Sequence, residues 1–201
     1  MRLPSESKQQ LFLKSMVPEN AVLFSGLGIM LAVAGTATVP QAFFLGSVAL
    51  ALMLATSFVA AVVNELVQKR TPLWPLVLLA ALLLALVRAL FQARINQLPQ
   101  GTAVVLALLA VSPVVYARAL NVTASTTVGR ALFDAAGAGL GQLAVLLGIG
   151  LLRELLGLGT VGASPAIAQP PLPWLGGALG GLLLTAAAIA LFRRFKPGSP
   201  S

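Results

Sequence analysis

Cysteine and histidine are both absent from this chain of 201 residues. Without cysteine, the chain cannot ligate zinc or an iron–sulfur cluster through thiolates, form a disulfide or use a thiol nucleophile. Without histidine, it lacks a common axial ligand of haem and the usual base that activates a catalytic cysteine. These absences exclude most metal-centre and thiol-dependent functions for the side chains of this protein.

Charged residues are scarce as well. Only 9% of the chain is charged, whereas 58% is hydrophobic, and the formal net charge is +8. A soluble domain of this size could not cover so much apolar surface, so the composition predicts an integral membrane protein. Nucleic-acid binding is not expected, because the basic residues stand at the ends of apolar segments and form no patch interleaved with aromatic residues.

The stretch 134–160 is the one around which the other segments are expected to pack. It opens with Asp134 and stays apolar until Arg153 and Glu154. A helix over this stretch rises about 1.5 Å per residue and is long enough to cross a hydrocarbon core of about 30 Å. Small residues that fall close to one helical face would let a neighbouring backbone approach. The glycines predicted to do so are Gly137, Gly141 and Gly148.

The remaining apolar segments predict five further spans. Two of them contain a helix break: Ser25-Gly26-Leu27-Gly28 weakens the first span, and Ser112-Pro113 interrupts the fourth, because proline removes a helical hydrogen bond. The first span is expected to end at Pro40. Residues 1–16 form an N-terminal segment with a short amphipathic lead-in, and residues 193–201 form a tail. The five spans cover about residues 17–39, 41–67, 73–91, 102–119 and 174–192.

The distribution of basic residues predicts the orientation of the chain. Six spans place both termini on one side of the membrane, and most basic residues fall on that side. Only Arg94 and Arg153 clearly fall on the other side, with Arg88 near it inside a span. The positive-inside rule therefore places both termini in the cytoplasm.

The two halves of the chain resemble each other, which predicts an inverted repeat over residues 17–93 and 101–192. Each half has a broken first helix, a long second helix that ends in a polar-Glu-Leu step at Glu65 or Glu154, and a third helix. Three spans per half give the halves opposite orientations. Repeats of this kind place a binding or transfer site near the midplane. The alternative interpretation is chance similarity between apolar segments.

Three charged residues of the fifth span are candidates for an ion path or a subunit interface. Arg153 and Glu154 either serve such a role or snorkel, alone or as a mutual pair, at the outer interface. Asp134 either binds a proton or cation, or lies in the first helical turn and stabilises the positive end of the helix.

Two further charged residues lie in the first half. Arg88 stands within a span, where charges are functional candidates, but its place near the span end also permits snorkelling. Glu65 is the counterpart of Glu154 and therefore a candidate, although Lys69 four residues later favours a surface ion pair.

The fifth span carries a resemblance to a known family. Its residues resemble the second-half signature of the Rnf and Nqr integral membrane subunits, which are paired six-span subunits of ion-pumping electron-transport complexes. The resemblance implies the bacterial inner membrane, other membrane subunits and lipid as partners, and a paralogous six-helix subunit of opposite orientation. The cytoplasmic N-terminus is more similar to the RnfE or NqrD type than to its inverted partner. The matching residues are Asp134, Gly139-Leu140-Gly141, Arg153-Glu154-Leu155-Leu156-Gly157 and Gly159-Thr160, supported by Gly26-Leu27, Leu31-Ala32-Val33 and Ala117-Arg118-Ala119.

The resemblance also implies where a cofactor would be held. In that family each subunit supplies two cysteines, one at each helix break, and the paired subunits hold an iron–sulfur cluster. The matching positions here are Gly28 and Pro113, which cannot ligate iron through a side chain. We therefore expect no cofactor on this chain.

The resulting functional hypothesis is a non-catalytic, structural subunit of an Rnf/Nqr-like electron-transport complex. The alternative is a subunit that translocates an ion or small solute at the midplane helix breaks. A free-standing membrane enzyme is not favoured, because the spans contain no nucleophile–base pair or metal cluster.

Overall fold

The computed structural model describes residues 7–16, 20, 23, 26, 28–67, 72–121, 127–162 and 164–195. These residues are helical apart from turns and one short hairpin, which confirms the all-α class. The α-helices are α1 (Lys8–Met16), α2 (Ile29–Ala34), α3 (Val39–Val67), α4 (Leu73–Ile95), α5 (Thr102–Leu108), α6 (Pro113–Ala117), α7 (Val128–Arg153) and α8 (Ala178–Phe195). The shorter elements are η1 (Leu109–Val111), η2 (Ala119–Asn121), the π-helical η3 (Glu154–Leu158), η4 (Pro173–Gly176), β1 (Thr160–Val161) and β2 (Ser164–Pro165).

Three helices in the described part of the chain are long and apolar enough to cross a membrane. They are Val39–Leu66, Leu73–Ile95 and Val128–Leu158, and a shorter apolar helix covers Thr102–Ala117. The polytopic character predicted from composition is therefore confirmed. Six crossings in two inverted repeats stay a prediction.

Several predicted boundaries are wrong. The fifth span begins at Val128, because Thr127 is extended and the helix hydrogen bonds continue through the polar residues before Asp134. The first span does not reach residue 39, since α2 ends at Ala34 and a turn follows. Pro40 lies in the first turn of α3, where a proline is tolerated, and so it does not end a helix.

Both predicted helix breaks are present. Between η1 and α6 the backbone of Ser112 is extended, with φ −71° and ψ 124°, and Pro113 opens α6. In the first half, Gly26 has a φ of +69°, a value that suits glycine, and Gly28 precedes the first residue of α2. Ser25 and Leu27 lie outside the described residues.

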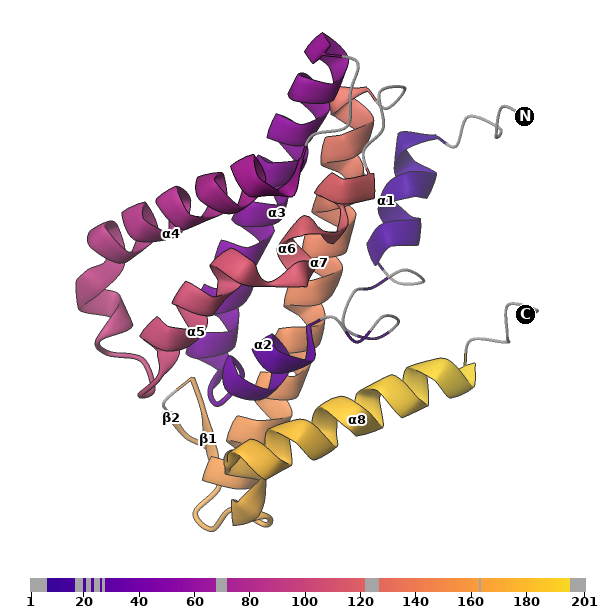
Figure 1. Ribbon diagram of the computed structural model, residues 1–201. Helices are drawn as coiled ribbons and strands as arrows, with labels where there is room; N and C mark the ends of the chain where they lie inside the picture. The colour runs from indigo at the N-terminus through magenta and orange to yellow at the C-terminus, as the bar shows by residue number, and fades with distance from the viewer. Residues whose placement is uncertain are drawn as a thin grey trace.

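The antiparallel pair of α3 and α7 makes the most extensive helix packing in the described part of the chain and stands at the centre of Figure 1. Glycines allow the close approach. A Cβ at Gly139 would lie 3.2 Å from the Leu50 Cα, and one at Gly150 would lie 3.0 Å from the Ala42 Cβ. Helices in lipid associate through such contacts, because lipid tails are as apolar as a leucine side chain.

Helix α1 lies alongside α7 (Figure 1). A methyl group at Gly137 would collide with the carbonyl of Phe12, and one at Gly141 would collide with the carbonyl of Met16. The predicted close approach is therefore confirmed at these two glycines. It is wrong for Gly148, which is exposed and has nothing within 4 Å of an added Cβ among the described residues.

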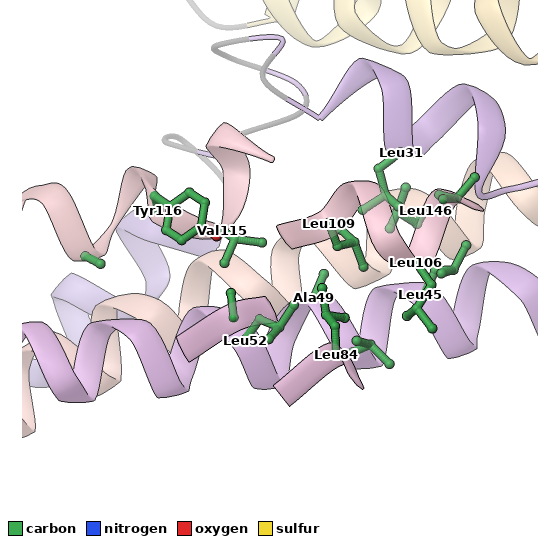
Figure 2. Packing of buried hydrophobic residues seen from close by; sticks show 14 of the residues in the cluster. Leu31, Leu45, Ala49, Leu52, Leu84, Leu106, Leu109, Val115, Tyr116 and Leu146 are labelled. Carbon is green, nitrogen blue, oxygen red and sulfur yellow. The ribbon is translucent and has the colours of Figure 1, made fainter. Parts of the chain in front are cut away.

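The apolar core lies between α3, α7 and the short helices of the second half. Figure 2 shows the side chains from α2, α3, α4, α5 and α6 that meet there. Two helices leave this core. Helix α8 crosses the end of α7 and projects away from it, and α4 diverges from α3 along its length (Figure 1). The labelled core residues are Leu31, Leu45, Ala49, Leu52, Leu84, Leu106, Leu109, Val115, Tyr116 and Leu146.

Candidate functional site

Helix α7 and the π-helical turn that continues it carry polar side chains at three levels along their length. Asp134 lies near one end, Gln142 near the middle, and Arg153 and Glu154 at the other end. At about 1.5 Å per residue, Asp134 and Arg153 are about 28 Å apart along the axis. That separation is close to the thickness of a hydrocarbon core of about 30 Å. These polar groups therefore sample most of the depth of a membrane.

The guanidinium of Arg153 is enclosed by oxygen atoms, and the residue is only 2% exposed. Its Nη1 donates to the carbonyl of Val33 at 2.7 Å and to the hydroxyl of Thr36 at 2.9 Å. Val33 lies in the last turn of α2, where carbonyls have no partner within the helix. One branch of the guanidinium thus supplies the hydrogen bonds that the end of α2 lacks.

The other branch of Arg153 holds the segment that enters α8. Its Nη2 donates to the carbonyls of Gly176 at 3.1 Å and Gly177 at 3.0 Å, and its Nε donates to the carbonyl of Leu175 at 3.4 Å. A Cβ at Gly181 would lie 2.9 Å from the guanidinium carbon, so this glycine leaves room for the charge. Arg153 therefore joins α2, α7 and the start of α8.

Glu154 is fully buried and serves a different partner from Arg153. Its carboxylate accepts the backbone N–H of Val39 at 2.6 Å and the hydroxyl of Thr160 at 3.1 Å. Val39 is the first residue of α3, so the carboxylate satisfies an amide at the positive end of that helix. Adjacent helical residues point in different directions, which allows Arg153 to hold the end of α2 while Glu154 holds the start of α3.

The interpretation of Arg153 and Glu154 as snorkelling residues is wrong, because neither side chain reaches the surface of the chain. The turn between α2 and α3 lies between a cation that binds carbonyls and a carboxylate that binds an amide. Sequence reasoning placed both residues at the end of the helix. It could not show that these two partners are more than a hundred residues away along the chain.

Asp134 joins three segments at the other end of α7. It accepts a hydrogen bond from the hydroxyl of Ser15 on α1 and lies 3.4 Å from the guanidinium of Arg118, which follows α6. The interpretation as a first-turn residue is wrong, because α7 begins at Val128 and has no acid in its first turn. The carboxylate instead links both broken-helix segments to α7.

Gln142 was missed by the sequence reasoning. It is 1% exposed, and neither its amide nitrogen nor its amide oxygen has a hydrogen-bond partner among the described residues. An unpartnered buried amide costs about 1–3 kcal/mol. The signal was available as a single amide within an otherwise apolar run.

The two positions that match the family's cluster ligands do not fit an iron–sulfur cluster. Gly28 is buried, and its carbonyl accepts the N–H of Ala32 at 2.9 Å, whereas Pro113 is exposed at the start of α6. Neither has a sulfur or nitrogen atom in its side chain that could ligate iron. Within the described ranges, no group of three or more histidine, cysteine or acidic residues could hold a metal ion.

The remaining sequence candidates lie apart from these contacts. Glu65 and Arg88 are both exposed, on α3 and α4 respectively. The predicted partner of Glu65, Lys69, lies outside the described residues. The structure thus brings α7 and its neighbours together around Asp134, Arg153 and Glu154, and it places Glu65 and Arg88 on the periphery.

A helical membrane protein with two broken helices, and with charged side chains held by distant segments toward both ends of its central helix, is the class that these observations define. The family model described as "Rnf-Nqr subunit, membrane protein" matches residues 8–194, and the chain belongs to this family.

The chain is similar to curated proteins of several bacteria, each of which is the E component of a membrane redox complex. It is 31% identical to that of the ion-translocating oxidoreductase complex of Shewanella amazonensis, over 71% of this chain and 61% of the relative. It is 26% identical to that of the proton-translocating ferredoxin:NAD(+) oxidoreductase complex of Clostridium ljungdahlii, over 75% of this chain and 71% of the relative. It is 34% identical to that of the ion-translocating oxidoreductase complex of Edwardsiella ictaluri, over 78% and 66%. The match to the Shewanella protein spans less than two thirds of that protein's length.

Proposed function

We propose that this chain is an integral membrane subunit of a bacterial electron-transport complex of the Rnf/Nqr type, with a structural role and no iron–sulfur cluster of its own. The observation that carries the proposal is the contrast within one chain. The bonds of Arg153 and Glu154 that tie α2, α3, α7 and α8 together are intact, whereas Gly28 and Pro113 offer no ligand.

The proposed topology has six crossings in two inverted repeats, with both termini in the cytoplasm. Support comes from a broken first helix in each half, since α1 and α2 are separated at Gly26 and Gly28, and α5 and α6 at Ser112. A long helix follows each break, α3 in one half and α7 in the other. The basic residues favour a cytoplasmic tail in the bacterial inner membrane.

The proposed partners are other membrane subunits, including a paralogous six-helix subunit of opposite orientation. A leucine row on α4 supports a lipid or protein neighbour there, because Leu78, Leu82, Leu86 and Leu90 recur every four residues and are all exposed. Such a row suits either acyl chains or a second helix.

Affinity purification of the tagged chain from its own membrane tests this proposal. We expect other integral subunits to co-purify, and we expect the isolated chain to contain neither iron nor acid-labile sulfide. A tagged relative that retains the family's cysteines, purified in parallel, is the positive control for cluster retention. Iron and sulfide in stoichiometric amounts on the isolated chain would refute the structural role, and purification without any membrane partner would refute the complex.

A second candidate function is translocation of an ion, and the observation that favours it is the set of polar groups along α7. Asp134, Gln142 and Glu154 lie at successive depths, and the amide of Gln142 has no partner among the described residues. Proton or cation flux into vesicles that contain Asp134→Asn, Glu154→Gln or Arg88→Gln separates the two functions. Flux that is unchanged in all three variants counts against translocation.

A further inference from the structure

A groove runs between α3 and α4, where the two helices diverge (Figure 1). Its volume is about 680 Å³. Sites that bind small organic molecules have volumes of about 300–1,000 Å³. Phe44 on α3 and Phe91 on α4 meet edge to face, with ring centroids 6.2 Å apart, and they line the groove together with the exposed Phe43.

The groove is polar at one end only. Arg94 and Gln97, at the end of α4 and in the turn after it, line the same end as Pro40 at the start of α3. The far end is formed by Ala51 and Val87 and is apolar. A ligand that fills this shape has one polar head and one apolar chain.

The length of the groove corresponds to one leaflet of a bilayer. From Pro40 to Ala51 the helix rises about 16 Å at 1.5 Å per residue. Half of a hydrocarbon core of about 30 Å is about 15 Å. Pro40 and Arg94 lie near the ends of two apolar helices, Val39–Leu66 and Leu73–Ile95, whereas Ala51 lies near the middle of the first. The polar end of the groove thus falls at the membrane surface and the apolar end near the midplane.

Arg94 has no counter-ion in the described part of the chain. Its side chain is exposed and makes no ion pair or hydrogen bond there, whereas Arg118 pairs with Asp134 and Arg153 is enclosed by carbonyls. A guanidinium at this depth binds phosphate well, because its planar fork donates two parallel hydrogen bonds to phosphate oxygens.

We propose that this groove binds one phospholipid of the adjacent leaflet, with its phosphate on Arg94 and Gln97 and one acyl chain along Phe43 and Phe44 toward Ala51. A transmembrane helix of a partner would need a surface across the full membrane, whereas this groove ends near the midplane. A quinone head is neutral and would leave the charge of Arg94 without a counter-ion. Charge complementarity and length therefore favour the phospholipid. An anionic headgroup strengthens binding, because it adds net negative charge beside the arginine.

Native mass spectrometry of the full chain, purified in a mild detergent, tests the proposal. We expect the wild type to retain one phospholipid per chain. Arg94→Gln should lower the occupancy about fivefold, as expected for the loss of one cation near a lipid surface, and Arg94→Lys should retain most of it. Arg88→Gln is the matched control, because it removes the same charge from the same helix but lies outside the groove.

A second pair of variants tests the apolar end without changing any charge. Ala51→Trp fills the groove and should abolish lipid retention, whereas Leu82→Trp, on an exposed face of α4, should not change it. Delipidated wild-type chain should also bind phosphatidylglycerol until one molecule per chain is bound, and this titration decides the matter even if a variant does not fold.

Three results would overturn the proposal. They are a bound mass that corresponds to a quinone, an equal loss of lipid in Arg94→Gln and Arg88→Gln, and a wild-type titration that does not saturate at one phospholipid per chain.

Discussion

At the scale of single residues, the adjacent charges of Arg153 and Glu154 divide their contacts between two chain ends. The guanidinium satisfies carbonyls that lack partners at the end of α2 and before α8, and the carboxylate satisfies an amide at the start of α3. Such groups are costly to leave without partners in a non-aqueous interior. The two side chains therefore fix the path of the backbone where regular helices end.

Replacement of Arg153 by methionine should destabilise the protein by about 3–5 kcal/mol, because it leaves several buried carbonyls without donors. Arg153→Lys should be intermediate, since one ammonium cannot reach both sets of carbonyls. The measurement is the temperature at which the detergent-solubilised chain loses its monodisperse peak in size-exclusion chromatography. Arg88→Gln, on an exposed position, should behave like the wild type, and a fully stable Arg153→Met would contradict the assignment.

Glu154 should tolerate glutamine better than alanine. Glutamine keeps an oxygen that can accept the N–H of Val39, whereas alanine leaves this amide without a partner and should cost about 1–3 kcal/mol. Thermal unfolding of the two variants, followed by circular dichroism, measures the difference. Equal losses in both variants would show that the charge, and not the hydrogen bond to Val39, is the stabilising feature.

At the scale of elements, the glycines of α7 decide which helices can lie against it. Gly137 and Gly141 admit the backbone of α1, and Gly139 admits α3, so a single helix has two closely packed faces. The sequence predicted close approach from the spacing of small residues. It could not identify α1 as the partner, because the pattern on α1 is that of a short amphipathic segment.

Gly141→Ala should displace α1 and destabilise the fold by about 1–3 kcal/mol, because the new methyl group would collide with the carbonyl of Met16. Gly148→Ala is the matched control on the same helix: its methyl group meets open space and should be neutral or slightly stabilising through helix propensity. Limited proteolysis of the N-terminal segment and thermal stability, measured on both variants, check the prediction. Equal behaviour of the two variants would mean that α1 does not depend on this contact.

At the scale of the whole molecule, the arrangement across the membrane is the property that most needs a direct measurement. The described part of the chain contains three helices long enough to cross, together with pairs of shorter helices on either side of each break. Short half-helices can complete a crossing only if another part of the protein covers the break. The crossing number thus depends on packing as well as on hydropathy.

The natural absence of cysteine makes a labelling test straightforward, because any introduced thiol is the only one in the chain. With six crossings, Gln97→Cys should react with a membrane-impermeant maleimide added to intact spheroplasts, whereas Ser199→Cys should react only after the membrane is opened. Early reaction of Ser199→Cys would place the C-terminus outside and refute the predicted orientation.

The sequence by itself determined the class of protein, both helix breaks and the lack of cluster ligands at Gly28 and Pro113. These properties follow from composition, apolar run length and the backbone chemistry of glycine and proline, all of which are local. The tertiary structure alone decided that Arg153 and Glu154 are buried, that Asp134 meets Ser15 and Arg118, and that the amide of Gln142 has no partner among the described residues. The physical reason is that a polar side chain within an apolar helix is equally compatible with lipid, water or protein until distant segments pack against it.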